Sequence, residues 1–291
     1  IDERESAVKV LISADMEGTC GVVSWVHVMP PEYGDGPSST AEYERARARM
    51  TREVNAAIEG ALAGGADEVI VNDSHDGMRN LIPEELHPSC RFISGNDKPL
   101  GMMQGIDLEG IGAVFYTGYH AKAGTPNAPL AHTWSGWIND VRIDGHSTGE
   151  FGINAVVAGH FNVPVTLVTG DVRAVEQTRE LLGDAVVGVA VKEGLSTFAA
   201  LHVHPEKAQQ LIREGAERAV KAVDAVEPFR LPAGAAVEIE FEHQTRADQA
   251  AYIPGVERGG ERFVRYQPAD GIEFVHTFRA IAKAAAVRMA P

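Results

Sequence analysis

The stretch that decides the fold is Lys9-Val10-Leu11-Ile12-Ser13-Ala14-Asp15-Met16-Glu17-Gly18. Its first half is apolar and rich in β-branched residues, which predicts a buried strand, and this strand runs directly into the carboxylates Asp15 and Glu17. Ligands of open α/β sheets bind beyond the carboxyl ends of the strands, so carboxylates there lie where metals and substrates are held. A single Asp at a strand end is more often a helix cap or an arginine partner, so the other strands have to decide.

Two further strands end in side chains that bind metals. Residues 68–72 are largely apolar and run into Asp73-Ser74-His75-Asp76-Gly77, and residues 113–119 run into His120. Gly118 precedes that histidine and permits a close approach of another backbone segment. Three strands therefore deliver ligand-type residues, and we expect them to meet at one edge of a sheet.

The order of the elements predicts the fold class. A helix from Thr40 to about Leu62, opened by Ser39 at capping-box distance from Glu42, separates the first two strands. This strand-helix-strand order is typical of a parallel sheet, so we expect an α/β fold with a mostly parallel open sheet flanked by helices. The polar segment from Pro30 to Pro37 is expected to form a wall or lid beside the site.

The chain is expected to divide near residue 228, where prolines interrupt a long helical pattern. Residues 1–7 would form an N-terminal tail, and residues 8–227 an α/β metal-binding catalytic domain. Residues 228–291 read as strand, helix, strand and helix, which predicts a smaller C-terminal α+β lobe.

Composition limits the class of protein. The chain has 291 residues, of which 44% are hydrophobic, and it can therefore bury a sizeable core. Its net charge of -15, with scattered Lys and Arg, argues against nucleic acid or a membrane surface as a partner. No apolar run approaches membrane-spanning length, and no signal-peptide pattern is visible. Two cysteines argue against a disulfide framework and fit a reducing compartment, so the cytoplasm is the default location.

Six side chains collect at the strand exits and beside them: Asp15, Glu17, His75, His120, His132 and Glu150. With the loop residue His132 set aside, two histidines and three carboxylates remain, a mixed set that suits Zn²⁺, Mn²⁺ or Co²⁺. One catalytic zinc commonly takes three protein ligands and a water, so five candidates fit a pair of ions bridged by a carboxylate. Such a pair polarises an acyl or phosphoryl oxygen, which predicts hydrolysis.

Other interpretations use the same residues. Glu150 at a helix start complements the macrodipole, and His120 could simply donate to a carbonyl. An amide hydrolase with another substrate would keep the same metals, whereas a two-metal phosphoesterase would need basic residues, of which only Lys98 and Lys122 are near in the sequence. A non-catalytic metal-binding ring protein would have closed metal coordination. Five ligands with a spare histidine favour an open, catalytic site over that last alternative.

The chain resembles the zinc-dependent D-aminopeptidase family, the DppA-like metallopeptidases. The resemblance is strong over about the first 170 residues, and it lies in a set of motifs that occur in the family's order. These are Ser13-Ala14-Asp15-Met16-Glu17-Gly18, Val71-Asn72-Asp73-Ser74-His75, Ile93-Ser94-Gly95, Gly118-Tyr119-His120-Ala121 and Gly149-Glu150-Phe151-Gly152-Ile153-Asn154-Ala155.

This resemblance implies a binuclear site with two Zn²⁺ per chain and gives each candidate residue a role. His132 is similar to the histidine proposed as catalytic nucleophile or base in that family. The implied ligands are Asp15 as the bridge, Glu17 and His75 on one ion, and His120 and Glu150 on the other.

The resemblance also implies substrates and an assembly. Family members remove N-terminal D-amino acids such as D-Ala from short peptides, and they form a homodecamer of two stacked pentameric rings around an internal chamber. In the reaction we expect His132 to pass a proton to the leaving amine. Asp73 or Asp76 could hold the substrate ammonium, and the spacing does not choose between them.

Overall fold

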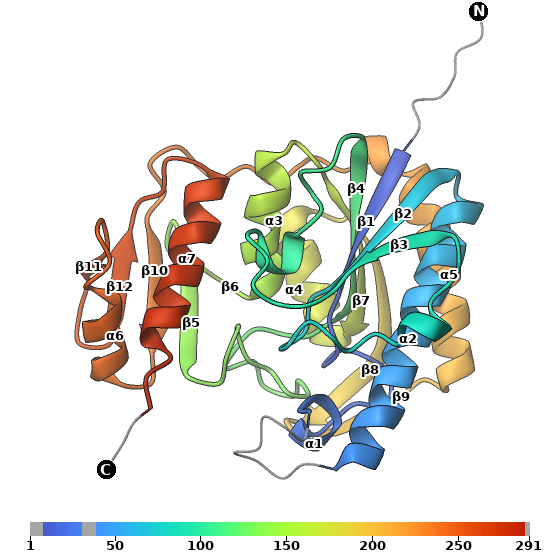
Figure 1. The fold of residues 1–291 in the computed structure, drawn as a ribbon, viewed down its shortest axis with the longest axis horizontal. Coiled ribbons are helices and arrows are strands. Elements are labelled where there is room, and N and C mark those ends of the chain that lie inside the picture. Colours follow the sequence, from blue (N-terminus) through green and yellow to red (C-terminus); the bar gives the residue numbers. More distant parts are fainter. Residues whose placement is uncertain (1–7, 31–38, 289–291) are drawn as a thin grey trace, which may run out of the picture.

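The larger sheet of the protein has seven strands in the order β3-β2-β1-β4-β7-β8-β9 (Figure 1). This computed structural model describes residues 8–30 and 39–288, so the predicted tail 1–7 and nearly all of the predicted wall or lid lie outside the described residues. Neighbouring strands are parallel except β8 and β9, which confirms the predicted fold class. The strands are β1 (Val8–Ala14), β2 (Ala66–Asp73), β3 (Cys90–Ile93), β4 (Ile111–Tyr119), β7 (Val165–Asp171), β8 (Val187–Ser196) and β9 (Ala199–His202).

Helices cover both faces of this sheet because its strands are apolar on both sides. Val10 and Ile12 of β1 pack toward α2 (Thr40–Ala63) and α5 (Pro205–Lys221), whereas Leu11 packs toward the opposite core. Each fully buried side chain of this size contributes about 1.5–3 kcal/mol of hydrophobic free energy. The second face is covered by α3 (Glu150–His160) and α4 (Val172–Leu182), so the sheet lies between two helical layers.

Helix α2 begins where its cap was predicted. The side chain of Ser39 accepts a hydrogen bond from the amide of Glu42, and the helix ends at Gly64. Its neighbour α5 passes so close that a Cβ atom on Gly60 would lie 2.2 Å from the carbonyl oxygen of Arg213. A glycine is therefore required at residue 60 for this helix pair.

A second, antiparallel sheet has the order β11-β12-β10-β5-β6, and it stands to the left of the larger sheet in Figure 1. Its strands are β5 (Ile138–Ile143), β6 (His146–Thr148), β10 (Val237–Phe241), β11 (Glu257–Arg258) and β12 (Phe263–Tyr266), and α6 (Gln244–Ala250) and α7 (Gly271–Ala285) pack on it. The hairpin 138–148 was assigned above to the larger domain, but it pairs with β10 of the C-terminal lobe. Local patterns do not reveal this pairing because the two strands are about a hundred residues apart.

The remaining helical segments are short, and two features were not predicted. The edge strand β9 follows β8 through a tight turn, and η3 replaces the weak helix expected near residues 101–112. These short helices are α1 (Trp25–Val28), η2 (Pro83–Glu85), η3 (Gly101–Met103) and η4 (Val223–Ala225). Within the described ranges, no helix is long and apolar enough to cross a membrane.

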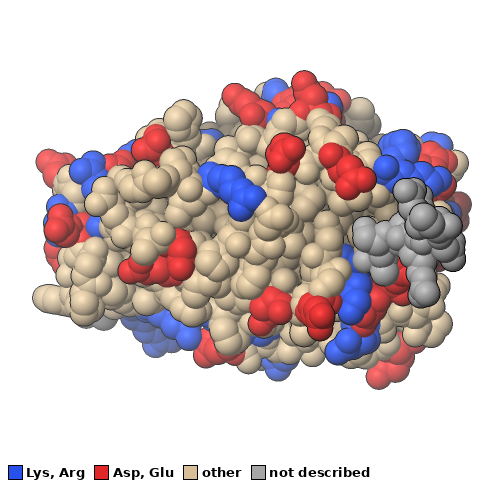
Figure 2. All heavy atoms as spheres, turned by 90° about the horizontal axis from the view of Figure 1, so that it is seen from above, with Lys and Arg blue, Asp and Glu red and all other residues tan. Residues whose placement is uncertain are grey.

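The charged side chains agree with the mixed, acidic composition. On the face shown in Figure 2, Lys and Arg lie singly or in small groups among Asp and Glu, without a continuous basic area. That face offers no extended positive surface for a polyanion.

The strand order creates a switch point between β1 and β4. After β1 the chain adds β2 and β3 on one side, and it then returns to place β4 on the other side of β1. Loops at the carboxyl ends of β1 and β4 therefore turn away from each other and leave a crevice, which is the usual ligand site of open α/β sheets. Asp15 and His120 follow these two strands directly.

Candidate metal centre

Two glycines bring the exits of β1 and β4 into backbone contact. The amide of Gly18 donates to the carbonyl of Gly118 at 2.7 Å, and a Cβ atom on Gly18 would lie 1.9 Å from the carbonyl oxygen of Tyr119. Gly118 has a φ of +68°, which L side chains rarely adopt. Only glycines at these positions let the segments that carry Asp15 and His120 approach this closely.

The two carboxylate oxygens of Asp15 face two different histidines. Oδ1 lies 3.3 Å from Nδ1 of His75, and Oδ2 lies 3.5 Å from Nε2 of His120. All three side chains are buried. Asp15 therefore stands between the residues delivered by β2 and those delivered by β4.

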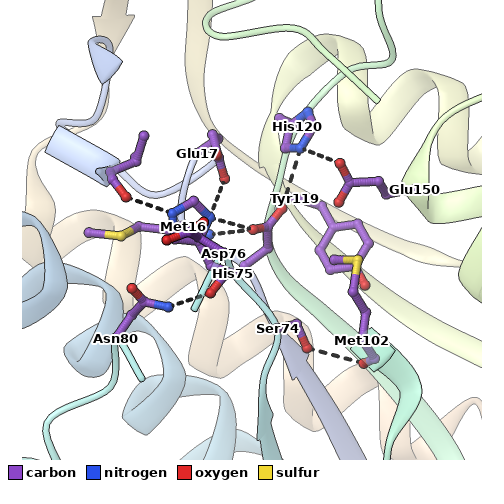
Figure 3. Close-up of polar contacts among 12 residues, drawn as sticks. Met16, Glu17, Ser74, His75, Asp76, Asn80, Met102, Tyr119, His120 and Glu150 are labelled. Atoms are coloured by element: carbon purple, nitrogen blue, oxygen red, sulfur yellow. Dashed lines mark hydrogen bonds and ion pairs between the residues drawn. The ribbon is translucent and has the colours of Figure 1, made fainter. Parts of the chain in front are cut away.

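Each histidine has a second carboxylate beside it. Oε2 of Glu17 lies 3.0 Å from Nδ1 of His75, and Oε1 of Glu150 lies 3.2 Å from Nε2 of His120. Figure 3 shows Glu17 directed at His75 and, on the other side of the site, Glu150 directed at His120. Glu150 is the first residue of α3, and its Oε1 also accepts a hydrogen bond from the amide of Trp134 at 2.8 Å.

Several polar atoms at the centre of this group have no hydrogen-bond partner among the described residues. Asp15 Oδ2, Glu17 Oε2 and His120 Nε2 are buried and unsatisfied, although each has another site atom within 3.5 Å. Buried polar atoms are normally satisfied, so an orphaned set that converges on one space requires a partner. A cation satisfies carboxylate oxygens and imidazole nitrogens together, and the donor set therefore fits a metal site.

Backbone carbonyls orient the three histidine rings. Nε2 of His75 donates to the carbonyl of Val28 at 2.8 Å, which leaves Nδ1 facing the carboxylates. Nδ1 of His120 donates to the carbonyl of Ala121 at 3.0 Å, which leaves Nε2 free. Metal-binding histidines characteristically donate their other N–H to such a partner, because this fixes the tautomer and the ring direction.

The charges of the site are mutually dependent. Burial, followed by repulsion from Glu17, raises the pKa of Asp15 to about 8. Burial alone would lower the pKa of His120, but the neighbouring Glu150 carboxylate overrides it and raises that pKa to about 10. Without a cation, protons on the histidines are the only charges that balance the buried carboxylates. A bound metal would replace those protons.

His132 lies at the open side of the group. Its Nδ1 donates to the carbonyl of Leu130 at 2.8 Å, and its Nε2 lies 3.7 Å from Glu150 Oε1 and 3.9 Å from Glu17 Oε1. Burial, followed by the charge of His120, lowers the pKa of His132. These distances are too long for hydrogen bonds, so Nε2 of His132 remains available to a substrate.

The six side chains can be divided into ligand sets in more than one way. Two groups hold ligand atoms within 4.8 Å of one another: His120 with His132 and Glu150, and Asp15 with Glu17 and His120. His75 belongs to neither group, but its direct distances to Asp15 and Glu17 are among the shortest in the site. The geometry thus brings all six predicted residues together and leaves two roles open for His132, as ligand or as proton carrier.

A pocket of about 630 Å³ opens onto this group. Its wall combines residues of both sheets' surroundings, with the indoles of Trp25, Trp134 and Trp137 and, from α7, the side chains of Arg279 and Lys283. A volume of this size suits a short peptide or another small molecule rather than a folded protein.

The structure separates the two carboxylates that had been considered for the substrate amine. Asp73 is buried and accepts hydrogen bonds from the amides of Asn80 and Leu81, so its carboxylate is already used in the fold. Asp76 is exposed and lines the pocket. Asp76 is therefore the one of the two that a substrate can reach.

Other candidates from the sequence are occupied. Lys98 is buried and donates to Asn72 Oδ1 and to the carbonyl of Asp73, both at 2.6 Å, so it is not offered to a phosphate. Cys20 is buried, and burial raises the pKa of its thiol to about 11, which argues against a nucleophilic role.

Sequence patterns did not reveal the residues that support the site. The carbonyls of Val28 and Leu130 orient histidines, yet a backbone carbonyl leaves no signature in a sequence. Lys192 is different, because a lysine inside the apolar run of β8 is a visible irregularity. That signal could have been read as a buried polar group in need of partners.

The chain is similar to D-aminopeptidases in both sequence and structure. The family model Peptidase_M55, described as D-aminopeptidase, matches residues 8–280. A D-aminopeptidase of Bacillus subtilis (strain 168) is 38% identical over 267 residues, which are 91% of this chain and 93% of that protein. The solved structure of the Zn-dependent D-aminopeptidase DppA from Bacillus subtilis, a self-compartmentalizing protease, matches with a TM-score of 0.90 at 34% identity, over 97% of this chain and 100% of that chain.

Proposed function

This chain belongs to the Peptidase_M55 family of D-aminopeptidases and is a peptidase, and from that premise we propose that it is a binuclear zinc enzyme that removes N-terminal D-amino acids, of the D-Ala type, from short peptides. The observation that carries the proposal is the position of Asp15, whose two carboxylate oxygens face two different histidines. A carboxylate in that position is able to bridge two ions.

The proposed ligands are the five residues that converge on the orphaned atoms. Zinc is supported by the mixed imidazole and carboxylate donor set and by the zinc dependence of the similar Bacillus subtilis protein. When bound, the ions would polarise the scissile carbonyl and lower the pKa of the attacking water. We assign Asp15 as the bridge, Glu17 and His75 to one ion, and His120 and Glu150 to the other.

The remaining steps belong to side chains at the pocket. His132 carries the proton to the leaving amine, because its Nε2 is unengaged and faces the space between Glu17 and Glu150. Asp76 holds the ammonium of the substrate, which makes the enzyme act on free N-termini. The pocket of about 630 Å³ limits the substrate to a short peptide.

We also propose that the protein works as a homo-oligomer in the cytoplasm, and as a decamer of two pentameric rings. The similar Bacillus subtilis protein is self-compartmentalizing, which requires several copies around a chamber. Large apolar side chains on the β8–β9 hairpin support a contact between copies, with Leu195, Phe198 and Leu201 each more than half exposed. Both cysteines are free, in keeping with a reducing compartment.

The test combines metal content with stereoselective hydrolysis. Protein purified without added metal is analysed for zinc per chain, and D-Ala and L-Ala p-nitroanilides are offered before and after chelation. About two zinc ions per chain and cleavage of the D-substrate that a chelator removes and zinc restores are expected.

Two results would count against the proposal. Two ions without cleavage of either anilide would move the activity to another amide, and the absence of bound metal after zinc titration would remove the binuclear site. Sedimentation of the same preparation checks the oligomer, since a monomer at working concentration would contradict the compartment.

A further inference from the structure

Lys192 is a buried lysine that the mechanism above does not use. It lies in β8 with only 2% of its surface exposed, and its ammonium donates to the backbone carbonyls of Glu17, Thr19 and Val22. An ammonium has three N–H donors, and here each has a carbonyl acceptor. The three acceptors all belong to the loop that follows β1, which we call the Glu17 loop (residues 15–23).

Other side chains hold the same loop from further directions. Glu53 of α2 accepts from the amide of Cys20 at 2.9 Å, and His202 of β9 accepts from the amide of Gly21 at 3.1 Å. Arg49 donates to the carbonyl of Gly21 at 3.1 Å. The loop is therefore held by groups from α2, β8 and β9, and Lys192 is the member that reaches the carbonyl of Glu17 itself.

Glu17 needs such a support because its surroundings repel it. Its carboxylate is buried beside that of Asp15, and its Oε2 is unsatisfied. Glu17 lies in a loop, so no helix or strand holds its backbone in position. A fixed carbonyl at the same residue determines where the Cα atom lies and which way the side chain leaves it.

We propose that Lys192 is a positioning residue, which holds the backbone of Glu17 so that its carboxylate stays beside His75 and retains the metal ion there. This inference rests on the proposed function, because it assigns that ion to Glu17 and His75. Groups behind metal ligands typically change metal affinity by about 10- to 100-fold when they are removed. The ion assigned to His120 and Glu150 lacks this support from Lys192.

The direct test is Lys192→Met, which keeps the length of the side chain and removes its three donors. Zinc per chain and zinc affinity are measured by competition with a chromophoric chelator, and the absorption of the Co²⁺-loaded protein reports ligand geometry. One ion is expected to bind about 10- to 100-fold more weakly, while the other keeps the wild-type affinity. Equal affinities of both ions in variant and wild type would overturn the proposal.

A matched control separates positioning from general destabilisation. Val191→Ala removes buried apolar volume from the adjacent position of β8 and leaves the lysine bonds intact. It is expected to lower the unfolding temperature and to bind both ions normally. If it weakens the same ion as Lys192→Met, loss of stability explains the result and the proposal fails.

The double variant shows whether Lys192 acts through Glu17. If it does, Lys192→Met together with Glu17→Gln loses no more zinc affinity than Glu17→Gln alone, because coupled residues are not additive. Additive losses would overturn the inference. If Lys192→Met does not fold, Lys192→Arg takes its place, since a planar guanidinium keeps the charge but cannot address three carbonyls as an ammonium does.

Failure of this inference is distinguishable from failure of the proposed function. Wild-type protein with two zinc ions and D-selective cleavage, combined with a fully loaded Lys192→Met variant, would remove only the role of Lys192. Wild-type protein that binds no zinc under any condition would contradict the proposed function itself.

Discussion

The imidazole rings of His120 and His132 are stacked, with their centroids 4.1 Å apart and an angle of 9° between their planes. Trp25 contacts the ring of His132 edge-on at 5.4 Å, so His132 is held between a proposed metal ligand and a wall of the pocket. This arrangement keeps Nε2 of His132 near the reaction space without a hydrogen bond of its own.

Replacing His132 by Ala is expected to lower kcat by about 10²- to 10⁴-fold, because a positioned proton carrier is lost. Zinc per chain should remain as in the wild type. Steady-state kinetics and metal analysis on the same preparation check both statements. Loss of one zinc ion would instead make His132 a ligand in the set with His120 and Glu150, and unchanged kcat would remove it from the mechanism.

Asp15→Asn is expected to remove activity and to weaken both zinc ions. The substitution keeps the size of the side chain but removes the negative charge that lies between His75 and His120. Zinc content after dialysis is the measurement, with His132→Ala as the comparison that should stay loaded. A variant that retains two tightly bound ions would show that Asp15 does not bridge them.

Asp76→Asn is expected to raise KM for substrates with a free amine roughly tenfold, since hydrogen bonds to charged groups are worth about 1.5–3 kcal/mol. The zinc content should not change, because Asp76 is exposed at the pocket rim. Kinetics over a range of peptide concentrations checks this prediction. An unchanged KM would mean that another group holds the ammonium.

Asp73→Ala provides the contrast, with an effect on stability. The Asp73 carboxylate accepts hydrogen bonds from two backbone amides, and leaving buried donors unpaired costs about 1–3 kcal/mol each. Denaturant unfolding should show this loss. A variant with wild-type stability would mean that these amides find other partners.

Glu53→Gln is expected to change how stability depends on pH. Burial raises the pKa of Glu53 from 4.5 to about 7, so the folded protein binds a proton that the unfolded chain has already released. The resulting stabilisation is complete below about pH 4.5 and is lost as the pH rises through 7. At about 1.4 kcal/mol per pKa unit it amounts to about 3 kcal/mol.

The measurement for Glu53 compares the free energy of unfolding of variant and wild type at about pH 5 and pH 8, with chelator and at equal protein concentration. Glutamine can still accept from the amide of Cys20, so the variant isolates the ionisation. The variant should gain stability relative to the wild type between the two pH values. An identical pH dependence in both proteins would contradict the raised pKa.

Much of the fold was predictable because its signals are local. The apolar runs of β1, β2 and β4 and the cap at Ser39 depend on neighbours within a few residues, and the structure confirms them. Parallel strands share one carboxyl edge, so the residues after these strands had to meet near one another. The convergence of Asp15, His75 and His120 follows from that rule.

The rest depends on contacts between distant parts of the chain. The hairpin 138–148 pairs with β10, and Lys192 reaches a loop about 170 residues earlier in the chain. Periodicity records which face of an element is apolar, but it does not record which partner covers that face.

The sequence by itself determined the types of side chain at the strand exits and, through the alternation of apolar residues, the sheet that presents them. Only the tertiary structure decided which oxygen of Asp15 faces which histidine and which carbonyl orients each ring. The physical reason is range: residue type and periodicity act over a few positions, whereas the geometry of a metal site is set by packing that joins loops from several strands.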